Sequence, residues 1–134
     1  MKKIGFLFVM LMALCVTPNT VFGQENSNEY LDLALQTPKL TVIPDYVFKM
    51  TDLKELDVAF NRIGVISQDI LKLTKLETLH LSGNQYLTEL PDFLAEMKSL
   101  KVIYFEGMGT WSQAKKDEAV QRFAQKGIKV VLKR

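Results

Sequence analysis

The chain has 134 residues, with 17 Lys and Arg, 15 Asp and Glu, and a single cysteine. This length suits one domain. The near balance of charge gives no support to nucleic-acid binding, and one cysteine excludes a framework of disulfides.

The first 23 residues are predicted to be a secretory signal peptide. Lys2 and Lys3 provide a basic start, residues 4–16 form an apolar run, and residues 21–23 place small residues at the −3 and −1 positions of a cleavage site. The run is shorter than the roughly 20 residues of a membrane-spanning helix. We therefore expect cleavage after Gly23, a secreted or periplasmic protein, and no membrane insertion after cleavage.

Cleavage would change the composition of the protein. The segment contains Cys15 and two of the 17 basic residues, so residues 24–134 would hold 15 basic and 15 acidic residues and no cysteine. Lipidation at Cys15 is a less favoured alternative, because Leu14 stands where a lipobox has a small residue.

From residue 30 onward the sequence repeats with a period of 23 or 24 residues. The positions that recur are apolar or Asn: Leu53, Leu56, Val58, Asn61, Ile63, Ile66, Ile70 and Leu73 return as Leu76, Leu79, Leu81, Asn84, Leu87, Leu90, Leu94 and Met97. Such a period indicates stacked units that share one core. We divide the chain into repeats at about 30–52, 53–75, 76–99 and 100–111.

The pattern L-x-x-L-x-L-x-x-N-x-L of the two central copies resembles the leucine-rich repeat family, in its short class of 23 or 24 residues, which includes secreted bacterial members. The resemblance implies an α/β solenoid with a parallel concave sheet of about five strands. It also implies non-enzymatic recognition of a protein or peptide partner on the concave face.

The asparagines of the central repeats, Asn61 and Asn84, are predicted to stack as a ladder beneath the strands. A side-chain amide both donates and accepts hydrogen bonds, so it can satisfy backbone groups that water cannot reach. In the last copy Met108 replaces the asparagine.

The register of the first repeat is open. If Leu33 and Leu35 are its inward-pointing pair, Pro38 stands at the ladder position. Leu31 and Leu33 are the alternative pair.

After the last repeat, residues 112–134 are predicted to form a cap. Ser112 is a good N-cap for a helix to about Gln125, and Gly127 can end it. The alternating apolar residues of 128–132 predict a final strand. Helix and strand would cover the open end of the stack.

The residues between the core leucines are predicted to point onto the concave face, in columns of equal repeat position. The middle column is Ala34, Asp57, His80, Tyr104 and Val131. From this column and its neighbours we predict a partner-binding patch formed by Glu55, Asp57, His80, Tyr104 and Glu106. Its carboxylates favour a basic partner, and its tyrosine is an amphipathic anchor. The competing interpretation is a solvated face that only keeps the sheet soluble.

A hydrolase using His80 is a remote alternative. Asp57 could orient the imidazole, but Ser82 lies two residues along the same strand, about 6.6 Å away, beyond hydrogen-bond reach. One histidine with scattered carboxylates lacks the spacing of metal ligands. We expect a protein that is not an enzyme, with no metal and no cofactor. Self-association of the short stack, through its convex side or an open end, is the alternative function.

Phe60 stands at the repeat position that glycine occupies in the later copies, at Gly83 and Gly107. The sequence leaves open whether its ring is an exposed turn aromatic or folds over the convex edge.

Overall fold

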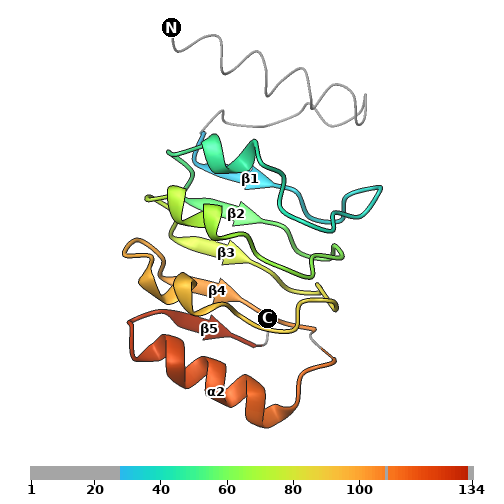
Figure 1. The fold of residues 1–134 in the computed structure, drawn as a ribbon, viewed down its shortest axis with the longest axis vertical. Helices are drawn as coiled ribbons and strands as arrows, with labels where there is room; N and C mark the ends of the chain where they lie inside the picture. The colour runs from blue at the N-terminus through green and yellow to red at the C-terminus, as the bar shows by residue number, and fades with distance from the viewer. Residues whose placement is uncertain (1–27, 108, 133–134) are drawn as a thin grey trace, which may run out of the picture.

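The computed structural model describes residues 28–107 and 109–132 (Figure 1). The predicted signal peptide with its cleavage site, Met108 and residues 133–134 lie outside this part of the chain. Within it, one parallel sheet holds five strands in sequence order. These are β1 Tyr30–Asp32, β2 Glu55–Asp57, β3 Thr78–His80, β4 Val102–Tyr104 and β5 Lys129–Val131. The predicted α/β solenoid is confirmed.

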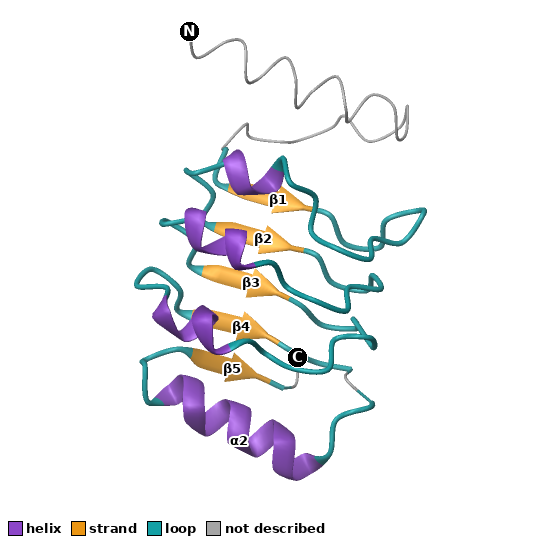
Figure 2. Cartoon of the chain, viewed as in Figure 1, coloured by secondary structure: helices purple, strands orange, loops and turns teal. Residues whose placement is uncertain are grey.

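The segments that return from one strand to the next carry short helices. Three are 3-10 helices, η1 Val47–Lys49, η2 Gln68–Lys72 and η3 Asp92–Glu96, and the last is the α-helix α2, Gln113–Ala124. Figure 2 shows them stacked beside one another along the sheet. Ile70 of η2 and Leu94 of η3 are fully buried, so each return closes the core on the convex side.

The core lies between the sheet and these returns. The middle residue of each inner strand points into it, and Leu56, Leu79 and Ile103 are fully buried. Their neighbours along each strand are half-buried, as the twofold alternation of a strand requires. One face of every strand is therefore committed to packing, and only the other is available for contacts with a partner.

The predicted asparagine ladder is present. The Asn84 amide donates to the carbonyls of Val58 (3.0 Å) and Leu81 (2.9 Å) and accepts from the amide of Ile63 (3.0 Å). Asn61 repeats the arrangement one rung earlier, donating to Leu33 and Val58 and accepting from Leu40. Each asparagine thus ties its own repeat to the preceding one, in a place closed to water.

The favoured register of the first repeat is wrong, and the alternative is correct. Leu31 pairs with Leu56, 25 residues further on, so the inward pair is Leu31 and Leu33. Gln36, not Pro38, then corresponds to Asn61. The physical reason lies at the strand end, where the Asp32 carboxylate accepts the amide of Ala34 at 2.8 Å, as the equivalent aspartate does in the next repeat.

The C-terminal cap also follows the prediction. Ser112 Oγ accepts the amide of Lys115 at the start of α2. At the other end Gly127 adopts a φ of +77°, and the amide of Ile128 donates to the carbonyl of Phe123. These are the bonds of a glycine-terminated helix. Phe123 is fully buried, so the helix covers the end of the core.

Candidate functional site

The sheet register brings the predicted middle column together. Asp57 pairs with His80, and His80 pairs with Tyr104. The first-repeat member of this column is Asp32, not the predicted Ala34, because of the corrected register. Val131 completes the column on β5.

His80 is held on two sides. Its ring stacks on that of Tyr104, with centroids 4.5 Å apart and planes inclined by 6°. Its Nε2 lies 2.8 Å from Glu55 Oε1. Only 12% of the His80 side chain is exposed. The histidine and tyrosine therefore form one flat aromatic platform that is fixed before any partner arrives.

Asp57 does not orient His80, and that part of the hydrolase hypothesis is wrong. Its Oδ1 accepts the backbone amide of Ala59 at 2.9 Å. An aspartate at a strand end can reach the amide two residues on, and so closes a local turn in preference to a distant ring. The carboxylate that meets the imidazole is that of Glu55, which lies diagonally across from it.

Ser82 serves the backbone as well. Its Oγ accepts the amide of Glu106 at 3.0 Å, which links β3 to β4 just beyond the strand ends. Among the described residues no hydrogen bond joins Ser82 to His80. The serine, histidine and aspartate do not assemble into a nucleophilic site.

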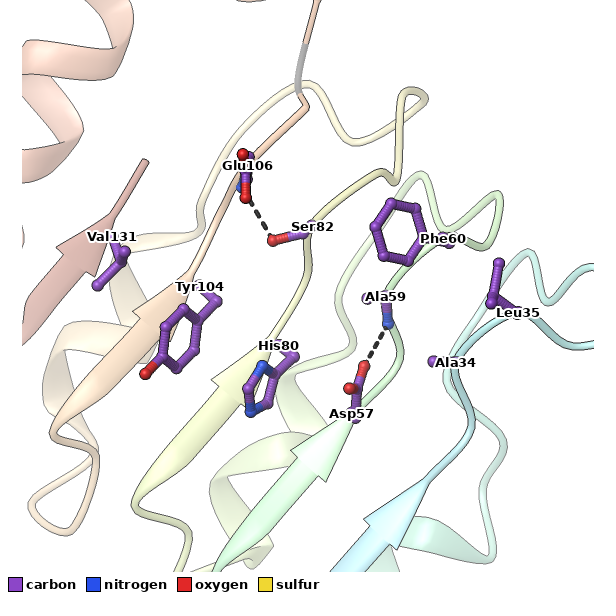
Figure 3. Close-up of a pocket in the computed structure, with 10 residues that line it drawn as sticks. All are labelled: Ala34, Leu35, Asp57, Ala59, Phe60, His80, Ser82, Tyr104, Glu106 and Val131. Atoms are coloured by element: carbon purple, nitrogen blue, oxygen red, sulfur yellow. Dashed lines mark hydrogen bonds between the residues drawn. The ribbon is translucent and has the colours of Figure 1, made fainter. Parts of the chain in front are cut away.

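A shallow pocket of about 200 Å³ opens at the carboxyl ends of the strands (Figure 3). Its lining residues are Ala34, Leu35, Asp57, Ala59, Phe60, His80, Ser82, Tyr104, Glu106 and Val131. Four of the five predicted site residues belong to this lining, and the fifth, Glu55, contacts it through His80. The predicted patch is thus one continuous area.

A family model described as leucine rich repeat matches residues 29–85 and, in a second overlapping match, residues 51–107. Together the matches span more than half of the 134 residues. The chain belongs to the leucine-rich repeat family. Leucine-rich repeats generally mediate protein–protein interactions and are typically non-enzymatic.

The rim of the pocket contains two residues that the prediction of the patch missed. Leu35 and Phe60 adopt φ values of +55° and +56°, and they are 64% and 48% exposed. Gly83 and Gly107 hold the same left-handed conformation in the next two repeats. The Phe60 ring is part of the lining of the pocket on the concave side, so it does not fold over the convex edge.

Gly83 makes room for that ring. A Cβ added to Gly83 would lie 2.5 Å from Phe60 Cδ1, whereas one added to Gly107 would have no neighbour closer than 3.7 Å. Lys39 Nζ also donates to the Phe60 carbonyl at 2.5 Å. The side chain and the backbone of Phe60 are both held by neighbouring repeats of the leucine-rich stack.

Charge is distributed unevenly over the concave sheet. Asp57 and Glu106 line the pocket, and in the part of the chain that the structure describes no Lys or Arg does so. Within residues 28–107 and 109–132, no group of three or more His, Cys, Asp or Glu side chains could hold a metal ion. No helix in the same part of the chain is long and apolar enough to cross a membrane.

The opposite edge, at the amino ends of the strands, is different. Lys54 Nζ lies 2.9 Å from Glu29, and Lys101 Nζ lies 2.7 Å from Glu77. The hydrogen bond and charge of Glu29 raise the pKa of Lys54, and those of Lys101 lower the pKa of Glu77. These two lysines are paired with carboxylates of the leucine-rich repeat domain itself.

Proposed function

We propose that this leucine-rich repeat protein is a non-enzymatic binding module that acts outside the cytoplasm. Its partner is a protein or peptide, and the binding surface is the concave face. The contact residues are Glu55, Asp57, His80, Tyr104 and Glu106.

The observation that carries this proposal is the stacked pair of His80 and Tyr104, fixed from the side by Glu55. A preorganised aromatic surface loses little conformational freedom on binding, which favours affinity. Tyrosine is enriched at the centres of interfaces because it offers apolar area together with a hydroxyl. A face that served only solubility would not require a half-buried platform.

The charge of the face supports a basic partner. Asp57 and Glu106 line the pocket beside the aromatic pair, and no Lys or Arg of the described part of the chain joins them there. Complementary charge steers encounter and selects between partners more than it adds affinity. We therefore expect the association rate to fall as the salt concentration rises.

Location outside the cytoplasm rests on the sequence alone. Residues 1–23 have the basic start, apolar run and small residues of a signal peptide. The mass of the protein recovered from outside the cytoplasm tests this directly, because cleavage after Gly23 leaves Gln24 as the first residue. An intact N-terminus would contradict it.

The binding proposal is tested by affinity capture from the source culture. The bait is residues 24–134, the form expected after cleavage. A variant with Asp57→Arg and Tyr104→Ala should retain less than a tenth of the captured partner. The matched control carries Asp45→Arg and Tyr86→Ala, which change the same residue types outside the pocket lining. Circular dichroism must show that both variants are folded.

Undiminished capture by the concave variant would place the binding surface elsewhere. Sedimentation velocity tests the alternative function, self-association. A monomer at micromolar concentration would contradict self-assembly, whereas an oligomer that dissociates in the concave variant would make a second copy of this chain the partner.

A further inference from the structure

We propose that the pocket at the carboxyl ends of the strands binds a single arginine side chain from an extended segment of the partner. This inference rests on the proposed function and specifies what the concave site recognises. It assigns the apolar rim, Leu35 and Phe60, to ligand binding together with the acidic patch.

The size of the pocket favours one side chain over a small-molecule ligand. Its volume is about 200 Å³. Sites for small molecules and cofactors generally have about 300–1,000 Å³. The pocket lies at the carboxyl ends of neighbouring strands, so an extended segment can cross the strands and place one side chain in it (Figure 3).

The walls of the pocket suit a long side chain with an apolar stem and a flat end. The Phe60 ring and Leu35 lie on one side, and Tyr104 and His80 lie on the other. Gly83 and Gly107 show that the scaffold needs no side chain at the rim position. The two bulky residues are therefore additions that shape this end of the pocket.

The polar groups of the pocket select a cation. Asp57 uses Oδ1 for the amide of Ala59, and its Oδ2 has no hydrogen-bond partner among the described residues. Glu106 supplies a second carboxylate to the lining. Lys39 donates to the Phe60 carbonyl and does not line the pocket.

Arginine fits this combination better than lysine. Its guanidinium group is planar, stacks on aromatic rings and donates to carboxylates in a fixed fork. Lysine carries a compact charge that stays strongly hydrated. We expect an arginine peptide to bind at least ten times more tightly than its lysine counterpart.

The test uses three blocked tripeptides, acetyl-Val-X-Val-amide, in which X is arginine, lysine or citrulline. Citrulline has the shape of arginine without its charge. Amide chemical shifts of the purified protein are followed during titration to millimolar peptide. The arginine peptide should shift the amides of Ala59, Phe60 and Ser82 saturably, and citrulline should bind at least tenfold more weakly. Equal binding of arginine and citrulline would overturn the inference, as would equal binding of arginine and lysine.

Two variants locate the site. Asp57→Asn keeps an oxygen for the amide of Ala59 and removes the charge, and it should weaken the arginine peptide at least tenfold. Asp32→Asn is the matched control, because Asp32 closes the same turn in β1 without lining the pocket. Phe60→Gly removes the ring at a left-handed position that glycine tolerates, and it should also weaken binding. Unchanged binding in both Asp57→Asn and Phe60→Gly would overturn the inference.

The two proposals fail in different ways. If capture of the natural partner depends on Tyr104 and Asp57 but no arginine peptide binds, the concave face is the binding surface and the arginine pocket is wrong. If the arginine peptide binds and the concave variant captures the natural partner undiminished, the pocket recognises a ligand other than that partner.

Discussion

The two edges of the concave sheet are built from the same strands, but they differ in how their side chains are paired. At the amino edge, Lys54 pairs with Glu29 and Lys101 pairs with Glu77. At the carboxyl edge, the aspartate that lines the pocket keeps an oxygen without a partner in the described chain, and two bulky apolar side chains stand exposed. The ion pairs of the amino edge join neighbouring repeats, whereas the carboxyl edge has the composition of a binding surface.

The backbone conformation at the carboxyl edge also supports a binding role for this edge. A non-glycine residue in the left-handed region costs about 1–2 kcal/mol. Two successive repeats bear this cost at Leu35 and Phe60, and the next two avoid it with glycine. Strain that a simple substitution would relieve is a reason to look for function at that position.

Removal of Asn84 should reduce stability the most, because the asparagine ladder connects the repeats that form both edges. Asn84→Ala would leave the amide of Ile63 and the carbonyl of Leu81 without their buried partner, and the Val58 carbonyl would keep only its bond from Asn61. Each such group costs about 1–3 kcal/mol, so the free energy of unfolding should fall by roughly 3 kcal/mol or more. Urea denaturation measures this. A loss below about 1 kcal/mol would show that the ladder does not hold the repeats together.

A smaller effect should separate two glycines of the carboxyl edge. Gly83→Ala combines left-handed strain with a clash against the Phe60 ring, and should cost roughly 2–3 kcal/mol. Gly107→Ala has the strain without the clash, and should cost about 1–2 kcal/mol. Thermal and urea unfolding of both variants give the difference.

That difference can be assigned to the ring by a double-mutant cycle. In a Phe60→Gly background, most of the extra cost of Gly83→Ala over Gly107→Ala should disappear, because the ring contacts are gone and only the approach to the Cα of residue 60, at 3.2 Å, remains. If the whole extra cost remains, the Phe60 ring is not the source of the difference.

The smallest effect is expected at the amino edge. The lowered pKa of Glu77 means that its pairing with Lys101 stabilises the fold above the ordinary glutamate pKa. This contribution is lost as the pH falls through the lower value of the folded state. Glu77→Gln should therefore reduce the melting temperature slightly at pH 7, and the gap from the parent should close towards pH 3. Because the pair is exposed, salt should also shrink the gap at pH 7. A gap that widens in acid would contradict the pairing.

The central repeats could be predicted because their apolar positions recur in a period that only stacked strands explain. The first repeat was harder, since its period is 25 residues and not 23. A local signal was present: Leu31-Asp32-Leu33-Ala34 returns as Leu56-Asp57-Val58-Ala59. The aspartate that closes the turn fixes the register better than the leucine spacing does.

The residues of the patch could be predicted from the alternation of side chains along a strand. Their contacts could not. Asp57 pairs with His80 in the sheet, but its carboxylate accepts a turn amide, and it is Glu55 that meets the imidazole. The role of Phe60 depends on a left-handed φ at a position where sequence rules expect glycine. Only the glycines at the same position in later repeats gave a hint of it.

Hydrogen exchange, measured on the protein with and without its captured partner, locates the binding surface. We expect slowed exchange at residues 57–60, 80–83 and 104–106, at the carboxyl ends of the inner strands, with no change in η2 and η3. Slowed exchange in the convex returns, with none at these strand ends, would contradict the assignment of the concave face as the binding surface.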